Sequence, residues 1–544
     1  MQNSFELNGW IVDIEGRRTY PGTVCVKDGI IDSINEDHDN NVPHHYIIPG
    51  FIDSHVHIES SMLIPSEFAR IAVTHGTIAT VSDPHEIANV CGMEGVEFMI
   101  EDGHKVPFQF YFGAPSCVPA TGFESAGAVL DSNDIKTLLN KPEIHYLAEM
   151  MNFPGVLNKD EEVMKKIAHA HRLNKPVDGH APALRGEDAK NYIAAGISTD
   201  HECFTSEEAL EKLDAGMKIL IREGSAAKNF DALVELLHEH YHQVMFCSDD
   251  KHPDSLVEGH INTLCARAVQ KGVDVYKVLR AACINPVLHY RLHCGMLLPG
   301  GSADIVVLED LKHFRVKQTY INGIKVAEEG KTLINRQDHG APINHFHCSP
   351  VSTESIKVPY RQQSQVPVIE AYDGQLITGK IMLEPKVVDG NIVTDTGRDM
   401  IKIVVVNRYH EAPPAVAFIK NTGIGKGAIA SSVAHDSHNI VAVGADDESI
   451  VKAINMVIEH KGGISCVWVE EEQVLPLPVA GLMSMDDGFE VARKYTAIDA
   501  LAKKTGSTLS SPFMTISFMA LLVIPHLKLS DKGLFDGDRF ELMC

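Results

Sequence analysis

The chain has 544 residues, and since one hydrophobic core rarely grows beyond roughly 300 residues, two or three domains are expected. It carries 48 Lys+Arg against 73 Asp+Glu, a formal net charge of -25, which argues against a nucleic-acid partner because no basic face is expected. The 11 cysteines show no paired spacing, so we expect reduced thiols in a cytoplasmic protein. No signal peptide and no apolar stretch of membrane-spanning length is visible, so we expect no membrane association.

Short strands are expected at both flanks of the first 340 residues. Residues 5–48 contain alternating or apolar runs separated by Pro-Gly and Asp-Gly turns, and residues 303–321 repeat this texture before Asn322-Gly323, a hairpin signal. The simplest arrangement pairs the two pieces. We therefore predict one small discontinuous β domain from residues 1–48 and 290–340.

The middle of the chain, residues 49–289, alternates strand-like runs with helix-like segments such as residues 161–174. The expected strand ends fall about 20 to 35 residues apart, the length that a strand, a helix and two loops need. They are His57, Asp83, Ala114, Glu149, His180, His201, Glu223 and Asp249. Eight such units predict an α/β fold of the (β/α)8 barrel type, with its active site at the carboxyl ends of the strands. A doubly wound open sheet is the alternative, but it would not bring the first and eighth strands together.

The texture changes again after about residue 345. Strand-like runs at 403–406, 415–418 and 440–443 precede a helix-like segment at 447–461, so we predict a separate C-terminal α/β domain over residues 345–544. The segment 435–439, His-Asp-Ser-His-Asn, stands before one of these strands. A surface loop is the expectation here, and its alternative is a contribution to the mouth of an active site, in this or a neighbouring subunit.

A metal site is predicted from the strand ends. His55 and His57 are two residues apart in a strand, so both side chains point to one face and can reach one ion. The barrel would add four further donors from later strands, namely Glu149, His180, His201 and Asp249. Four imidazoles and two carboxylates can hold two divalent cations that lower the pKa of a shared water. Taken singly, each residue has an ordinary alternative as a satisfied polar group at the barrel rim.

Four stretches carry a resemblance to a known family. They are PGFIDSHVHIESS at 49–61, SDPHEIAN at 82–89, AEMMNFPGV at 148–156 and SDDKHPD at 248–254. With them the chain resembles the metal-dependent amidohydrolase superfamily and, within it, the adenine deaminase family. The resemblance implies hydrolytic deamination of adenine to hypoxanthine and ammonia in purine salvage, by a hydroxide that bridges two cations and attacks C6. It suggests Mn²⁺ or Fe²⁺, with zinc possible, and we expect a homo-oligomer.

The same resemblance suggests catalytic roles. Asp249, besides binding metal, would take the proton of the hydroxide and pass it to the departing amine. Related deaminases often place a glutamate three residues after the fifth-strand histidine, but this position is Ala183. We therefore predict that Glu223, at the seventh strand end, is the acid that protonates the purine ring. Its alternative is a rim glutamate paired with Arg222.

Other polar residues near the strand ends are candidates for substrate contact. His85 is predicted to contact substrate or a metal-bound water, with helix capping as the alternative. Glu59 is expected to hold a metal ligand in place. Glu59, Glu86 and His252 are the candidate substrate-binding residues, and His252 lies on the loop after the eighth strand, where it can close over the base.

Two other functions remain open from the sequence. An amidohydrolase that acts on a cyclic amide or another nucleobase is one, although dihydropyrimidinase-like enzymes often use a carboxylated lysine where this chain has Glu149. A catalytically silent assembly protein is the other, but such a protein should have lost ligands, and none of the six is missing.

Overall fold

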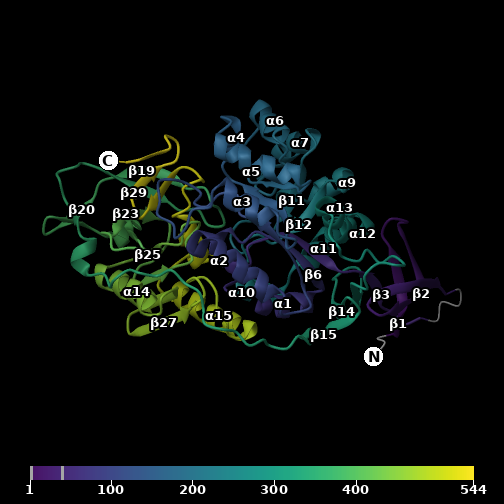
Figure 1. Ribbon diagram of the computed structural model, residues 1–544. Coiled ribbons are helices and arrows are strands. Elements are labelled where there is room, and N and C mark those ends of the chain that lie inside the picture. The colour runs from purple at the N-terminus through teal and green to yellow at the C-terminus, as the bar shows by residue number, and fades with distance from the viewer. Residues whose placement is uncertain (1–3, 38–41, 544) are drawn as a thin grey trace.

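The two flanking pieces pair into one eight-stranded sheet, as predicted. In the computed structural model, which describes residues 4–37 and 42–543, the strand order is β16-β15-β14-β13-β4-β1-β2-β3. The two pieces lie side by side at one end of the molecule (Figure 1). The first piece supplies β1 (Ser4–Asp13), β2 (Arg18–Lys27), β3 (Ile30–Glu36) and β4 (Tyr46–Pro49). The second supplies β13 (Ile305–Leu308), β14 (Val316–Ile321), β15 (Ile324–Glu328) and β16 (Lys331–Thr332). Asn322 and Gly323 turn between β14 and β15 with positive φ at both positions, which a tight hairpin requires.

Eight parallel strands form the predicted barrel. They are β5 (Phe51–Val56), β6 (Thr77–Ser82), β7 (Gln109–Ala114), β8 (Ile144–Met150), β9 (Val177–Gly179), β10 (Thr199–Asp200), β11 (Lys218–Arg222) and β12 (Val244–Cys247). Two hydrogen bonds close the ring: Ser198 N donates to Val177 O (2.9 Å) between β9 and β10, and Asp249 N donates to His55 O (2.9 Å) after β12. This closure rules out the open sheet and brings the first and last strand ends together.

Helices alternate with the barrel strands along the chain. They include α1 (Pro65–Ala72), α2 (His85–Gly103), α3 (Ser132–Leu139), α5 (Glu161–Arg172), α7 (Ser206–Asp214) and α11 (Ile261–Gln270). Apolar residues of α5, such as Val163 and Ile167, are buried at helical spacing, which is the pattern expected for residues 161–174.

The C-terminal region is richer in antiparallel sheet than predicted. Its main sheet has the order β19-β18-β23-β22-β25-β24-β26-β27, and the β18–β23 pair alone among these neighbours is parallel. The strands are β18 (Val366–Glu370), β19 (Gly379–Leu383), β22 (Ile401–Val406), β23 (Ala415–Lys420), β24 (Ala428–Ser431), β25 (Ile440–Gly444), β26 (Gly463–Trp468) and β27 (Glu471–Pro476). Helices α14 (Asp447–Glu459), α15 (Gly488–Lys504) and α16 (Pro512–Phe518) accompany it. Antiparallel neighbours need no helical crossover, so the predicted α/β domain is a β domain with a few helices.

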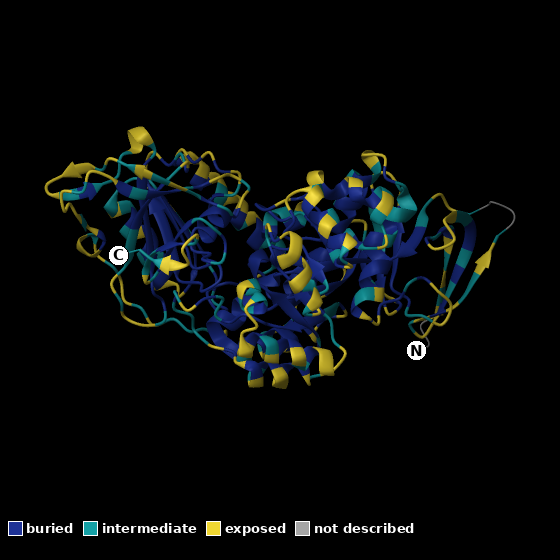
Figure 2. Ribbon diagram, turned by 90° about the horizontal axis from the view of Figure 1, so that it is seen from above, coloured by how far each residue is buried: buried dark blue, intermediate teal, exposed yellow. Residues whose placement is uncertain are grey.

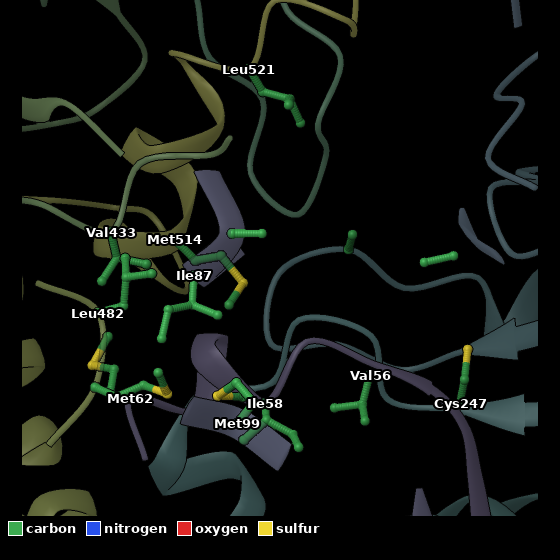
Figure 3. Packing of buried hydrophobic residues seen from close by; sticks show 14 of the residues in the cluster. Val56, Ile58, Met62, Ile87, Met99, Cys247, Val433, Leu482, Met514 and Leu521 are labelled. Carbon is green, nitrogen blue, oxygen red and sulfur yellow. The ribbon is translucent and has the colours of Figure 1, made fainter. Parts of the chain in front are cut away.

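The barrel and the C-terminal domain share one hydrophobic cluster. Figure 3 shows Val56 and Ile87 of the barrel in the same cluster as Val433, Met514 and Leu521 of the C-terminal domain. Buried strands lie at the centre of both parts, while exposed positions gather on the outer helices (Figure 2). The segment 435–439 belongs to this buried region, since each of its residues is at most 4% exposed. The prediction of a surface loop at 435–439 is therefore wrong.

Two further expectations concern the environment of the chain. The cysteines of the described residues are free thiols, as the scattered spacing predicted. Among the described residues, no helix combines the length and hydropathy needed to cross a membrane.

Asp53 on β5 ties the first barrel strand to the segment after the last one. Its carboxylate, fully buried, accepts hydrogen bonds from Ser248 N (2.9 Å), from Ser248 Oγ and from His260 Nε2 (2.8 Å). Replacing Asp53 with Ala leaves these buried donors unpaired, and we expect the free energy of unfolding to fall by about 3 to 5 kcal/mol. Thermal unfolding followed by circular dichroism tests this. Asp32→Ala, at an exposed position of β3, is the control and should shift stability by no more than about 0.5 kcal/mol; equal melting of both variants would contradict the role of Asp53.

Candidate metal centre

The first strand and the end of the last strand bring three donors together. His55 lies on β5 and His57 one residue beyond its end, so that their Nε2 atoms are 3.2 Å apart. Asp249 Oδ1 lies 3.5 Å from His55 Nε2 and 3.2 Å from His57 Nε2. The alternation of side chains along β5 thus aims both imidazoles at one carboxylate oxygen.

Glu149, on β8, stands between this group and two further histidines. Its Oε1 is 3.3 Å from His57 Nε2, while its Oε2 is 2.9 Å from His180 Nδ1 and 3.2 Å from His201 Nε2. His180 follows β9 and His201 follows β10. The structure therefore brings all six proposed metal ligands to the carboxyl end of the barrel, with one carboxylate shared by two sets of imidazoles.

The distances among these donors fit metal ions. Two ligands that each lie about 2.1 Å from one ion are roughly 3.0 to 3.4 Å apart at coordination angles between 90° and 109°. The separations of His57 Nε2 from Asp249 Oδ1 and of His201 Nε2 from Glu149 Oε2 are both 3.2 Å. The donor sets His55–His57–Asp249 and His55–Glu149–His201 are buried. In each set the ligand atoms lie close enough together to share one cation. Imidazole and carboxylate together suit divalent ions such as manganese, iron and zinc.

Arg222 and Glu202, which the sequence reasoning missed as site residues, support the ligand Asp249. The Arg222 guanidinium, only 1% exposed, donates to Asp249 Oδ2 (2.7 Å) and to both oxygens of Glu202. Burial acts to raise the pKa of Asp249, but the charge of Arg222 and the neighbouring His55, His57 and His201 together outweigh burial and hold this pKa well below its usual range. The ligand carboxylate therefore stays ionised.

Glu202 also adds a carboxylate that could bind metal and that the spacing of the strand ends did not indicate. Its Oε1 lies 3.5 Å from His201 Nε2 and 3.6 Å from His180 Nδ1. The residue follows His201 directly, and its place beside a strand-end histidine was the available signal.

Glu223, the predicted ring acid, is not brought to this centre. Its carboxylate pairs with Arg267 (2.7 Å) and lies 3.6 Å from Lys228. Neighbouring residues at a strand end point to opposite sides, so Arg222 faces the barrel interior while Glu223 faces outward. The alternative pairing of Glu223 with Arg222 is also wrong, because Arg222 bonds Glu202 and Asp249 instead.

His85 and Glu86 begin helix α2 next to the ligands. His85 Nδ1 is 3.0 Å from Asp83 Oδ2 and 3.5 Å from Glu149 Oε1, and the N-cap of α2 is Pro84 rather than His85. Glu86 accepts hydrogen bonds from His435 Nδ1 (2.5 Å) and from His438 Nε2. His85 thus lies at the centre, whereas Glu86 joins the barrel to the C-terminal domain.

Glu59 and His252 lie behind the pocket. Glu59 Oε1 accepts the N–H of Ile87 (3.1 Å), and burial raises the pKa of Glu59 to about 7. His252 Nδ1 is hydrogen-bonded to the hydroxyl of Tyr495 at 2.6 Å. Neither residue lines the pocket beside the metal ligands, so both support surrounding elements and neither is placed to contact a substrate there.

The pocket above the ligands has one wall from the barrel and one from the C-terminal domain. The barrel contributes His85, Glu86, Met151 and Asp250. The C-terminal domain contributes Leu376, His435, Asp436, Phe518 and Leu521. The segment 435–439 therefore reaches the active site of its own chain, which is the alternative that the sequence left open.

Comparison with known proteins gives two family matches that together span most of the chain. Residues 46–326 match the amidohydrolase family, and residues 375–541 match the adenine deaminase C-terminal domain. An adenine deaminase of Salinibacter ruber is 53% identical over 100% of this chain and 99% of its own length. Adenine deaminases of Methanosarcina mazei and Borreliella burgdorferi are 52% and 46% identical, each over 98% of this chain and 98% of its own length.

The support that Arg222 gives to the metal ligands can be tested directly. Arg222→Met leaves Asp249 and Glu202 buried without their cation, so we expect metal affinity to fall about 10- to 100-fold. Metal content after dialysis against a graded chelator series measures this loss. Arg267→Met, which removes the partner of Glu223 on the outer side of β11, is the matched control and should retain metal like the unmodified protein. Equal metal retention by both variants would contradict the assignment.

Proposed function

Because this chain belongs to the adenine deaminase family of amidohydrolases, we propose that it hydrolyses adenine to hypoxanthine and ammonia. The observation that carries the proposal is the meeting of four imidazoles and two carboxylates in a buried pocket at the carboxyl end of the barrel. That edge is where barrels of this type place their chemistry. Fold alone would not assign a reaction, but fold, ligand set and full-length similarity agree on this one.

The six donors would hold two divalent cations. His55, His57 and Asp249 would hold one, His180 and His201 the other, and Glu149 lies between the two sets. When bound, such cations lower the pKa of a coordinated water towards neutrality and so supply a nucleophile for C6 of the purine. We propose Mn²⁺ or Fe²⁺ as the ions, since mixed imidazole and carboxylate sets accept both and zinc as well.

Asp249 is suited to move a proton within this site. Its Oδ2 is fixed by Arg222, which leaves Oδ1 on the side of His55 and His57. Oδ1 would receive a proton from the attacking water and deliver it to the amine that leaves C6. Because the pKa of this carboxylate is low, the proton is passed on rather than retained.

The wall from the C-terminal domain excludes water from the reaction. Leu376, Phe518 and Leu521 are each buried and line the pocket opposite the barrel. Removal of bulk water strengthens the hydrogen bonds and charge interactions inside. The C-terminal domain therefore takes part in the site as a cover.

The other two functions are less well supported. A cyclic-amide hydrolase of the dihydropyrimidinase type is disfavoured by Glu149 at the fourth strand and by the match of residues 375–541 to the adenine deaminase C-terminal domain. A silent assembly protein has no need of six converging buried donors, and all six are present.

An ammonia-release assay tests the substrate. The purified protein, loaded with Mn²⁺, is offered adenine, adenosine, cytosine and guanine in parallel, and we expect release from adenine alone. Removal of metal by chelator should abolish the release, and added Mn²⁺ should restore it, because the nucleophile depends on the cations. Release from another base but not from adenine would overturn the proposal, and near-zero metal in protein purified without chelator would revive the silent scaffold.

Replacement of Glu223 tests where the ring acid lies. Since the Glu223 carboxylate faces Arg267 outside the pocket, we expect Glu223→Gln to keep turnover of adenine within about threefold of the unmodified protein, well short of the roughly 100-fold loss typical of a removed general acid. Steady-state kcat on adenine is the measurement. A loss of 100-fold or more with unchanged metal content would restore Glu223 as the acid.

A further inference from the structure

The segment 435–439 is anchored in the pocket by one barrel carboxylate. His438 Nδ1 accepts the backbone N–H of Ala434 (3.2 Å), so its hydrogen is on Nε2, which donates to Glu86. His435 Nδ1 donates to the other oxygen of Glu86 (2.5 Å). Two imidazole donors on one buried carboxylate fix this segment against the start of α2.

This anchoring places a second carboxylate, Asp436, in the pocket without a donor. Asp436 is 4% exposed, and its Oδ2 accepts no hydrogen bond from any described residue. Its Oδ1 lies 3.8 Å from His85 Nε2, an atom that lies 3.3 Å from Glu86 Oε1 and makes no hydrogen bond to any described residue. A buried acceptor left unpaired is costly. The unpaired Oδ2 therefore points to a ligand that brings an N–H to Asp436.

The surroundings of Asp436 fit a planar base. The Phe518 ring stacks on His435 with centroids 5.1 Å apart and an interplanar angle of 25°, and Leu376 and Leu521 line the same wall. Such flat and apolar surfaces suit the faces of a purine. Asp436 lies on the side of His85 that is remote from Glu149, because His85 uses Nδ1 towards Glu149 and Nε2 towards Asp436.

A purine whose C6 faces the metal ligands has N9, in its five-membered ring, on the side remote from them. In adenine the one ring N–H of the common tautomer is on that ring, at N9, and an ionised carboxylate can only accept. Resting on the function proposed above, we infer that Asp436 accepts a hydrogen bond from N9–H of adenine and selects the free base against nucleosides. In a nucleoside N9 bears the sugar, so the carboxylate would stay buried and unpaired while the sugar met the wall of the C-terminal domain.

A third cation at His85, Glu86 and Asp436 is the competing explanation, since their ligand atoms lie close enough to share an ion. The contacts favour the base, because both oxygens of Glu86 are already engaged by imidazole donors. Metal analysis distinguishes the two explanations.

The test compares adenine with 9-methyladenine in the full-length metal-loaded protein. The unmodified protein should prefer adenine in kcat/KM. In Asp436→Ala we expect this preference to fall at least about tenfold, with KM for adenine raised about 10- to 100-fold and kcat changed less. Asp436→Asn keeps a neutral acceptor and should give an intermediate preference. Asp531→Asn is the control, since Asp531 accepts from Asn407 Nδ2 (2.8 Å) and Ser125 N (2.9 Å) outside the pocket lining, and it should keep the original preference.

Product binding makes the test independent of turnover. Calorimetric titration with hypoxanthine and 9-methylhypoxanthine should show the same loss of preference in Asp436→Ala. An unchanged preference in Asp436→Ala would overturn the inference. So would a metal content of three ions per subunit in the unmodified protein that falls to two in Asp436→Ala. Failure of the proposed function looks different, because the unmodified protein would then release no ammonia from adenine.

Discussion

Arg222 supplies the permanent positive charge against which the carboxylates of the metal centre are buried. It holds Glu202 and Asp249 at once, and burial of either acid without it would be costly. Because the guanidinium is planar and always charged, it fixes the orientation of Asp249 as well as its charge. The side of Asp249 that faces His55 and His57 follows from this constraint, and bound cations would complete the balance of charge.

Strand geometry made much of this centre predictable. Polar residues at intervals of one β/α unit identified the strand ends, and alternation along β5 placed His55 and His57 together. The same alternation explains the failure for Glu223: the sequence offers two adjacent polar residues after β11, and only the register of the strand decides that Arg222 faces inward. Register at a strand end depends on tertiary hydrogen bonds such as Arg222 N to Asn229 Oδ1, which no periodicity reveals.

The contribution of the C-terminal domain lay beyond prediction for a different reason. Glu86 meets His435 and His438 across about 350 residues of chain, and neither partner shows a local pattern that points to the other. The segment 435–439 is polar and precedes a strand, which is the ordinary signature of a surface loop. It is buried with both of its imidazoles hydrogen-bonded to a carboxylate from another domain. Likewise, the three predicted strands at 403–406, 415–418 and 440–443 are present as β22, β23 and β25, but the other strands of this sheet and its antiparallel pairing required the structure.

The division of the pocket between two domains sets an order of events during synthesis. All six proposed metal ligands have been synthesised once residue 249 is made, whereas the wall that covers the base is drawn from residues 376–521. The strands that complete the sheet of the small β domain, β13 to β16, emerge between these two sets. A nascent barrel therefore contains every ligand for its ions well before it has a compartment for the base. Metal loading and substrate recognition are separable stages in the life of the chain.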